Sequence, residues 1–509
     1  MAAPSSGVKV RMYRQGHGDC FLLAFASSRG RPAYVLIDCG YKPGSNGEEY
    51  GLKHIDAIVD NIKASTNGHL DLVIITHEHQ DHVNGFWKEN DPYFKDFKVD
   101  AAWFAWTENA EDDLANELRE RHGDQLLGLV AARNRLAAAG ANDAAQRLDE
   151  FLSLELGIDN PAGFAATAAA KKKNPENSIN KQGMKLIKEK AGKKNVEYIY
   201  PHRKIMTVPR VNGVRVFALG PPYNAKLLAD TDPKGAEAFP GQGFRARSSF
   251  FAAAEAADNP NSLRGVQPFA RRFAVPIEQA FTHAQHGEFF RSRYGNDEAQ
   301  PIAAQASDEV GKNEAWRRID NDWLYSAEDF ALYLNEGINN TSLVLAFELP
   351  KSKKVLLFAG DAQRGNWTSW TKGWNGSDEK GVVRDLLSRT VLYKVGHHGS
   401  HNATLNGTAE DDYPNLAWMG HGKYGSEFVA MITAVNKWAL GVKPKPWRHP
   451  LPSIKAALHT KCRGRVFQTD TNNFDSPADP SDSDWKEFLG RAYINHPDRL
   501  YFEYEIYDR

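Results

Sequence analysis

Residues 72–82 read LVIITHEHQDH. The first four are apolar and include β-branched side chains, which predicts a short buried β-strand. Three histidines and an aspartate follow directly, within residues 77–82. Loops at strand ends often carry chemistry, and imidazole and carboxylate are ligands that Zn²⁺ and similar ions prefer. The stretch therefore predicts a metal site; the alternative is a solvated, histidine-rich loop.

The composition is that of a globular chain. Its 509 residues allow one elaborated domain or two to three ordinary ones. A net charge of −1 provides no overall basic surface, so nucleic-acid binding would need a local patch. Three cysteines without a CxxC pair argue against a disulfide framework and against a thiolate zinc site.

The sequence carries no membrane signal. Residues 1–9 contain no apolar signal core, and no apolar run approaches the roughly 18 residues of a transmembrane helix. We therefore expect a cytoplasmic protein with no membrane partner.

Two strands are expected before the metal loop. Residues 8–25 alternate around a glycine-containing turn, which predicts a β-hairpin, and residues 34–40 form an apolar run. Asp38, near the end of that run, has two interpretations. It is either a turn former or an acceptor that holds the second ring nitrogen of a ligand histidine. Residues 52–62 have the apolar spacing of a helix.

Two later segments also end in potential ligands. Residues 343–347 and 354–358 read as a hairpin that leads into Asp361, and the apolar run 391–395 leads into His397 and His398. Strand ends at one edge of a sheet converge although they are distant in sequence. The joint occurrence of these segments, in this order, indicates one shared site.

The pattern resembles the metallo-β-lactamase superfamily, and within it the hydrolase domain of competence-type DNA-uptake proteins. The resemblance covers about half of the chain, in pieces. The matching pieces are residues 16–19, 36–40, 76–82, 339–345, 357–361, 392–400 and 449–450. The resemblance implies an α/β fold, an αββα sandwich of two sheets between helices, with a dinuclear metal site.

The resemblance also implies ligand roles. The first metal would be held by His77 and His79, and Asp361 would bridge both metals. The second metal would be held by Asp81, His82 and the histidine after the late strand, for which His397 is preferred because it comes first. Asp38 would support a ligand histidine from behind. The two ions would be Zn²⁺ or Mn²⁺.

One ligand of the family pattern is missing. Many relatives supply a further first-site histidine from the middle of the chain, but here the corresponding strand ends in residues 218–222 without one. His202 precedes that strand. We therefore expect the first metal site to be incomplete.

The resemblance and the periodicity divide the chain into five segments. Residues 7–107 and 338–509 are expected to form the two halves of the catalytic domain, and residues 196–224 its central strands. Two mainly helical insertions are expected at 108–195 and at 225–337, the second a possible lid. Residues 171–194 hold nine lysines against two glutamates, a local charge of +7. This segment is interpreted either as a solvated surface or as a phosphate-binding patch.

These features favour a phosphodiesterase or nuclease that uses a metal-bound hydroxide, with nucleic acid or a small phosphodiester as its partner. Catalytic roles are assigned to Asp81, His398, Lys394 and His449, with Arg448 as a further cation near phosphate. His17 and Asp19 are candidate pocket residues. The alternatives are a small-molecule hydrolase acting on a lactone, thioester or cyclic nucleotide, or a non-catalytic, metal-stabilised interaction module. The pair His283 and His286 is interpreted as surface polar residues.

Overall fold

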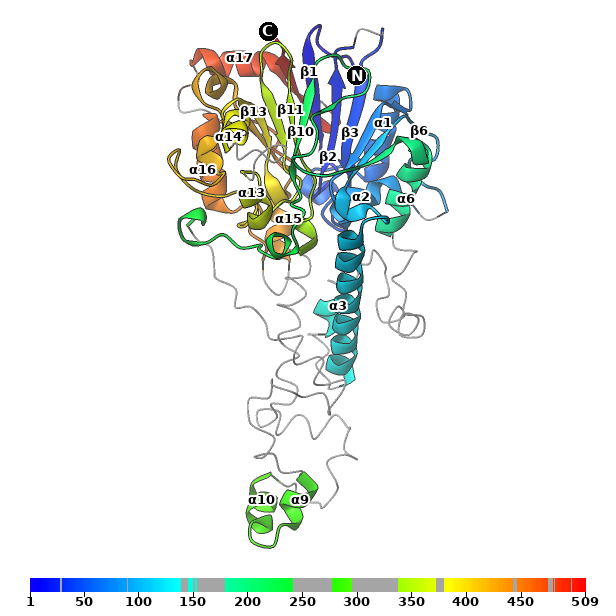
Figure 1. Ribbon diagram of the computed structural model, residues 1–509, viewed down its shortest axis with the longest axis vertical. Helices are drawn as coiled ribbons and strands as arrows, with labels where there is room; N and C mark the ends of the chain where they lie inside the picture. Colours follow the sequence, from blue (N-terminus) through cyan, green and yellow to red (C-terminus); the bar gives the residue numbers. More distant parts are fainter. Residues whose placement is uncertain are drawn as a thin grey trace.

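A computed structural model provides the fold. It describes residues 1–27, 30–88, 90–138, 145–149, 152, 179–240, 277–294, 337–371, 380–442, 446–474, 479, 481–495 and 497–509. The described chain is a mixed α/β structure with two large sheets (Figure 1).

The first sheet has eight strands in the order β16-β17-β1-β2-β3-β5-β7-β8. Strands β3, β5, β7 and β8 run parallel to one another, and the remaining pairs are antiparallel. The bounds are β1 (Gly7–Tyr13), β2 (Cys20–Phe25), β3 (Ala33–Cys39), β5 (Leu72–Ile75), β7 (Ala102–Ala105), β8 (Val196–Ile199), β16 (Ala492–Ile494) and β17 (Tyr501–Tyr507).

The second sheet has seven strands in the order β15-β14-β13-β12-β11-β10-β9. Strands β12 to β15 are parallel, and β9 to β12 are antiparallel. The bounds are β9 (Met206–Thr207), β10 (Arg215–Gly220), β11 (Val344–Glu348), β12 (Val355–Phe358), β13 (Thr390–Lys394), β14 (Val429–Ile432) and β15 (Val466–Gln468). A separate two-stranded sheet pairs β4 (His69–Leu70) with β6 (Lys98–Val99).

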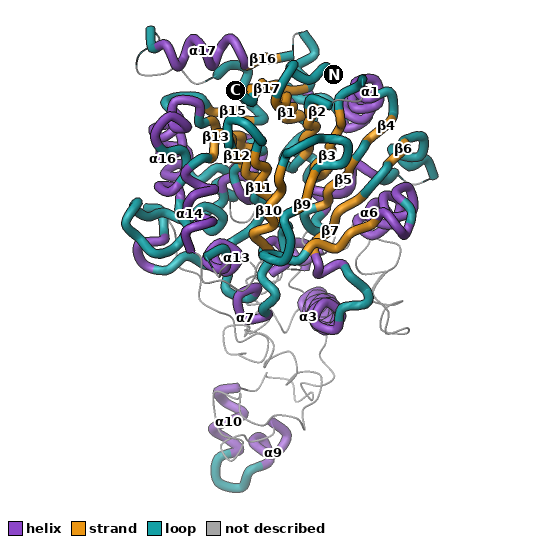
Figure 2. Tube along the Cα trace, turned by 45° about the horizontal axis from the view of Figure 1, so that its top comes forward, coloured by secondary structure: helices purple, strands orange, loops and turns teal. Residues whose placement is uncertain are grey.

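Helices cover the outer faces of both sheets (Figures 1 and 2). The α-helices are α1 (Ile55–Thr66), α2 (Gln80–Val83), α3 (Asp113–Ala138), α6 (Ile179–Ala191), α7 (Ala225–Leu228), α9 (Ile277–Thr282), α10 (Gly287–Tyr294), α13 (Arg364–Ser369), α14 (Lys380–Ser388), α15 (Asn436–Gly441), α16 (Pro452–Cys462) and α17 (Ser483–Arg491). The 3₁₀ helices are η1 (Glu48–Tyr50), η2 (Asn84–Phe86), η3 (Trp106–Glu108), η4 (Lys193–Asn195), η5 (Gly235–Glu237), η10 (Gly396–Gly399), η11 (Leu416–Trp418) and η12 (Gly422–Glu427).

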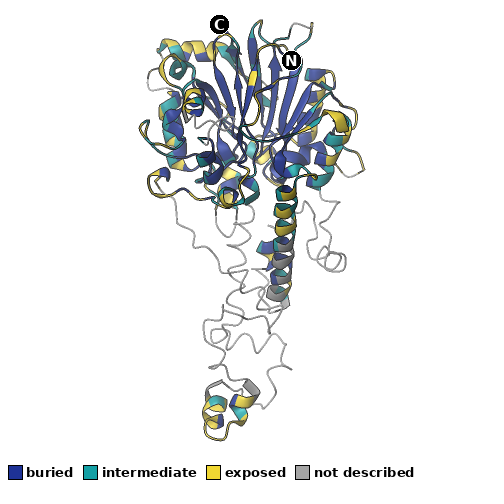
Figure 3. Ribbon diagram, in the orientation of Figure 1, coloured by how far each residue is buried: buried dark blue, intermediate teal, exposed yellow. Residues whose placement is uncertain are grey.

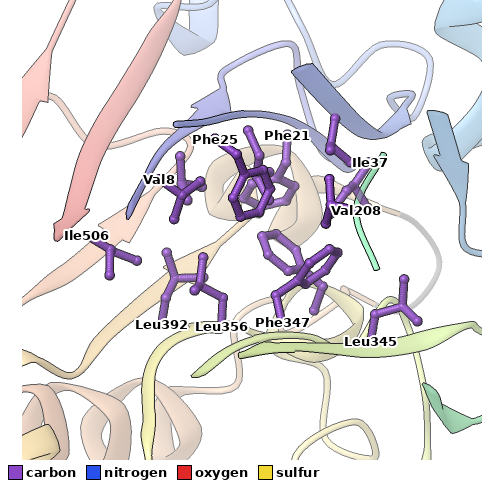
Figure 4. Packing of buried hydrophobic residues seen from close by; sticks show 14 of the residues in the cluster. Val8, Phe21, Phe25, Ile37, Val208, Leu345, Phe347, Leu356, Leu392 and Ile506 are labelled. Carbon is purple, nitrogen blue, oxygen red and sulfur yellow. The ribbon is translucent and has the colours of Figure 1, made fainter. Parts of the chain in front are cut away.

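The layers follow from the period-2 alternation of the strands. In β2, Phe21 and Phe25 point between the sheets, whereas Leu22 points to the outer layer that contains α1 and α6. Figure 4 shows the inter-sheet layer, where Phe21 and Phe25 pack against Phe347 of β11. A third apolar layer joins the second sheet to α14 and α16. The strands are therefore buried on both faces (Figure 3), and the predicted α/β class is confirmed.

Each large sheet combines strands from distant segments of the chain. The segment 196–224 contributes β8 to the first sheet and β9 and β10 to the second. The C-terminal strand β17 returns to the first sheet and pairs with β1, Gly7 opposite Tyr507. Both ends of the chain therefore lie together (Figure 1).

The two expected insertions are described only in part. Helix α3 lies in the first insertion and extends away from the sheets, with exposed residues along it (Figure 3). Of residues 139–178 in the same insertion, the structure describes 145–149 and 152, so the lysines at 171–173 lie outside the described residues. Within 225–337, the structure describes residues 225–240, 277–294 and 337.

Candidate metal centre

Four strands bring their carboxyl ends to one place. Strands β3 and β5 are parallel neighbours in the first sheet, and β12 and β13 are parallel neighbours in the second. The two sheets meet there, because the Leu343 N–H donates to the Thr76 carbonyl at 2.9 Å. The loop after β5, the loop after β12 and the turn after β13 therefore face one another.

Four buried side chains converge at this junction. Single ligand atoms of Asp81, His82, Asp361 and His398 all lie within 4.8 Å of one another. His82 Nε2 is 3.2 Å from Asp361 Oδ2, and His398 Nε2 is 3.0 Å from Asp81 Oδ2. The set is two imidazoles and two carboxylates, which suits a borderline divalent ion.

Asp38 holds His82 from behind. His82 Nδ1 donates to Asp38 Oδ2 at 2.8 Å, and the Thr76 N–H and hydroxyl donate to the same carboxylate at 2.8 and 2.7 Å. A proton on Nδ1 leaves Nε2, which faces the cluster, available as a ligand. Asp38 thus occupies the supporting position that one interpretation of the sequence assigns to it.

His77 and His79 lie beside the cluster as a separate pair. His77 Nε2 is 3.1 Å from His79 Nδ1, and His79 Nδ1 donates to Asn339 Oδ1 at 2.7 Å. Burial and the neighbouring histidines His82 and His79 hold the pKa of His77 well below its usual value. Among the described residues, no group of three or more His, Cys, Asp or Glu ligands includes His77 or His79.

The expected gap in the first site is visible at β10. The strand ends at Gly220, whose α-carbon packs against the side chain of Asn366, so the position has no room for an imidazole. His202 is not part of the His/Asp cluster, and burial lowers its pKa to about 4.

The His/Asp cluster includes the second histidine after the late strand, His398, whereas the sequence-based preference was for His397. His397 and His398 both have positive φ, 43° and 55°. This left-handed turn directs His398 inward, where its Nδ1 donates to the Thr433 carbonyl at 3.0 Å. His397 Nε2 is 4.0 Å from Asp361 Oδ2, and its Nδ1 meets Ser400 Oγ at 2.8 Å.

Two buried lysines accompany the carboxylates. Lys394, at the end of β13, contacts Asp19 and lies 3.2 Å from Asp361 Oδ1. Lys42, from the loop after β3, lies 3.0 Å from Asp81 Oδ1. Burial lowers the pKa of Lys394, but the carboxylates of Asp19 and Asp361 outweigh burial and raise it, so the ammonium is charged at neutral pH.

The same charges set the protonation of the ligands. Burial lowers the pKa of His82, but Asp361, Asp19 and Asp38 outweigh it and raise the pKa well above its usual value. Burial raises the pKa of Asp81, but Lys42 and His398 outweigh it and hold the pKa well below its usual range. Asp81 is therefore ionised, and His82 is protonated with its Nε2 directed at Asp361 Oδ2, 3.2 Å away.

His17 and His449 border the cluster beside His398. The His17 ring centroid is 4.3 Å from that of His398, and His17 Nε2 is 3.2 Å from His449 Nδ1. Burial lowers the pKa of both His17 and His449 well below the usual value, which makes both rings neutral at pH 7. Arg448, next in the chain, is exposed.

Glycines fix the metal loop between two other segments. A β-carbon on Gly18 would lie 2.5 Å from the Asp81 carbonyl oxygen, and one on Gly40 would lie 2.4 Å from the Asp81 carbonyl carbon. The Asp19 N–H donates to that same carbonyl oxygen at 2.9 Å. The backbone of Asp81 is therefore held by the turn of the first hairpin and the end of β3.

The residues present fit a cation. His82 Nε2 and Asp361 Oδ2 are fully buried and face each other across 3.2 Å, with no other hydrogen-bond partner in the described structure. A divalent cation could replace the shared proton and be bound by both groups. The expected metal-binding character is thus supported by the His/Asp cluster, with Asp81, His82, Asp361 and His398 as its members.

Sequence reasoning missed three contributors to the site. These are Lys42, Asn339 and Thr433, which contact Asp81, His79 and His398 respectively. Lys42 follows the end of β3 by three residues and Asn339 precedes β11, so proximity to a strand end was the available signal.

His283 and His286 stack on each other at 5.1 Å between α9 and α10, and no metal-ligand group of the described residues includes them.

None of the helices that the structure describes combines the length and apolar character needed to cross a bilayer. Comparison of the chain with protein-family models and with curated proteins finds no match.

Proposed function

We propose that this chain is a metal-dependent hydrolase that cleaves phosphodiester bonds, built on a metallo-β-lactamase-like sandwich. The observation that carries the proposal is the convergence of Asp81, His82, Asp361 and His398 at one buried point. A His/Asp set at the carboxyl ends of strands is the usual place for catalysis in layered α/β folds. The layering of helices outside two sheets supports the same proposal.

Cations near the cluster favour a phosphodiester over a neutral carbonyl substrate. Lys42 and Lys394 lie buried beside the carboxylates of the cluster, a setting in which charge stabilisation is strong. Helix α6 and the turn after it, residues 179–194, carry six lysines against Glu189. This helix packs beside the metal loop, because Asn180 Nδ2 donates to the Glu78 carbonyl at 3.2 Å. A polyanion at the site would thus meet positive charge from two directions.

The roles of the chain's residues follow from their positions. Asp81, His82, Asp361 and His398 would hold the divalent ion, which when bound supplies Lewis-acid activation of water and of the phosphoryl oxygen. Lys394 neutralises Asp19 and Asp361 and keeps the carboxylates in place. His449 is neutral and has Nδ1 against His17. A neutral imidazole in this position could accept a proton from the attacking water.

The test is a hydrolysis panel with zinc- or manganese-loaded protein. The substrates are single- and double-stranded DNA, RNA, bis(p-nitrophenyl) phosphate, a cyclic nucleotide and a lactone. We expect cleavage of phosphodiesters by the wild type and loss of cleavage in Asp361→Asn. Asp508→Asn is the matched control, because Asp508 is also buried but accepts its hydrogen bonds from Lys351 and Ser352. Activity on the lactone alone refutes the phosphodiester proposal.

A further inference from the structure

An aromatic group stands next to the cluster and has no role in holding metal. We call it the aromatic wall: Trp438 of α15, Trp447, His449 and His17. The His17 ring lies 5.1 Å from Trp438 and is stacked on His449 at 5.3 Å. Trp447 lies 5.5 Å from both Trp438 and His449. The four rings therefore form one group of contacting aromatic side chains beside His398.

The aromatic wall begins at the metal ligands and ends at the surface. His17 is buried, and its ring centroid is 4.3 Å from that of the ligand His398. Trp438, Trp447 and His449 are each partly exposed. One imidazole, that of His17, therefore lies between the cluster and two partly exposed indoles.

The wall is held rigidly. The Trp447 N–H donates to the Ala439 carbonyl of α15 at 2.9 Å, and Asn436 Nδ2 donates to the His449 carbonyl at 3.0 Å. The loop after β3 supports α15 from the other side, since Lys437 Nζ donates to the Glu49 carbonyl at 3.4 Å. Rings fixed in this way lose little conformational entropy when a flat ligand stacks on them.

Positive charge flanks the wall. Lys437 and Arg448 are exposed and are direct sequence neighbours of Trp438 and Trp447. Beyond His449, an open hollow of about 540 Å³ is lined in part by Lys455 and His459 of α16. Aromatic rings interleaved with cations are the combination that binds unpaired bases and their phosphates.

We propose that the aromatic wall stacks on a nucleobase adjacent to the phosphate that enters the cluster, so that the ligand is an unpaired nucleotide unit. The inference rests on the proposed function, which places a phosphate at the cluster. The unit is either part of a single strand or a free nucleotide. Paired bases in a duplex are already stacked on their neighbours and cannot use the wall.

The experiment measures binding without turnover. Full-length protein in chelator is titrated with a fluorescent short thymidine strand and with an abasic strand of the same length, and anisotropy reports the affinity. We expect the wild type to prefer the base-bearing strand. Trp438→Ala and Trp447→Ala should each lose about 5- to 150-fold in affinity for that strand and leave abasic binding unchanged.

Conservative variants and a matched control guard against misfolding. Trp438→Phe and Trp447→Phe keep a stacking ring and should retain most of the preference. Leu440→Ala is the matched control. Leu440 lies on the same helix as Trp438, is 50% exposed and is not part of the wall, so this variant should behave like the wild type. Thymidine monophosphate as competitor separates the two sources. Displacement near the strand's own affinity identifies a free nucleotide, and displacement only at far higher concentration identifies a strand.

Equal affinity for base-bearing and abasic strands overturns the inference, as does an unchanged preference in both alanine variants. If the protein prefers the base-bearing strand but hydrolyses no phosphodiester, the aromatic wall is supported as a base-binding site and the proposed hydrolysis is refuted. The two ideas therefore fail separately.

Discussion

Replacement of Asp38 by asparagine tests how the site controls a ligand. Asp38 is fully buried and has φ 54°, a left-handed conformation that asparagine also adopts. The substitution keeps the shape and one oxygen for the Thr76 N–H. It places an NH₂ group opposite His82 Nδ1. Because an NH₂ group can only donate, Nδ1 must then act as the acceptor and carry no proton. His82 must then carry its proton on Nε2, which points at Asp361 instead of binding metal.

The magnitude follows from the bond that is lost. The Asp38–His82 bond is 2.8 Å long and involves a carboxylate. Hydrogen bonds to charged groups contribute about 1.5–3 kcal/mol, and about 1.4 kcal/mol is tenfold in affinity. We therefore expect zinc to bind Asp38→Asn about 10- to 150-fold more weakly, close to the roughly 10- to 100-fold effect of removing such supporting partners.

The assay is calorimetric titration of metal-free protein with zinc at constant pH. Asp508→Asn again provides the control, because this buried aspartate lies away from the cluster and its loss should leave zinc affinity unchanged. An affinity for Asp38→Asn equal to that of the wild type would show that the tautomer of His82 is not set by Asp38, and would refute the reasoning.

Three further outcomes are expected. His398→Ala should weaken zinc binding by about tenfold or more and His397→Ala by less, measured by competition with a chromophoric chelator; the reverse order would restore His397 as the ligand. Lys394→Met should lower the free energy of unfolding by about 3–5 kcal/mol, because it leaves buried carboxylates without a cation, and added zinc should recover part of this in urea unfolding; no loss would contradict the ion pair. Burial raises the pKa of Glu427, but hydrogen bonds from Lys354 and a nearby arginine outweigh it and lower the pKa below 4.5. The stability that Glu427 contributes should thus be complete above pH 4.5 and be lost as pH falls through the lowered pKa. The Tm difference between wild type and Glu427→Gln should then shrink in acid, and a constant difference would speak against this pairing.

Local patterns predicted the strands that carry the site. The apolar runs 72–75 and 391–395 became β5 and β13, and the ligands follow them directly. Parallel strands place their ends at one edge, so the meeting of Asp81, Asp361 and the late histidine pair was within reach of the sequence.

The choice between the neighbouring histidines His397 and His398 could not be predicted from the sequence. His397 and His398 differ by one position, and which ring turns inward depends on two consecutive left-handed residues. Left-handed φ is uncommon in any residue other than glycine, even though histidine is among the types that adopt it more often, so the sequence did not predict it at two consecutive positions. Lys42 and Asn339 come from loops whose course is set by tertiary packing, and their pairing with Asp81 and His79 is long-range.

The C-terminal strand shows the same limit at the level of the fold. Residues 501–507 alternate and form β17, yet the partner β1 lies at the opposite end of the chain. Periodicity identifies a strand but not its neighbour.

The glycines beside Asp81 have a consequence for how the candidate centre would take up an ion. Because Gly18 and Gly40 enclose the loop backbone, its course is determined by the surrounding fold. The binding energy of an ion would then not be spent on ordering a disordered chain, in contrast to small domains that fold only around their metal. The candidate site is preorganised, and a chelator should remove a bound ion while the architecture around it persists.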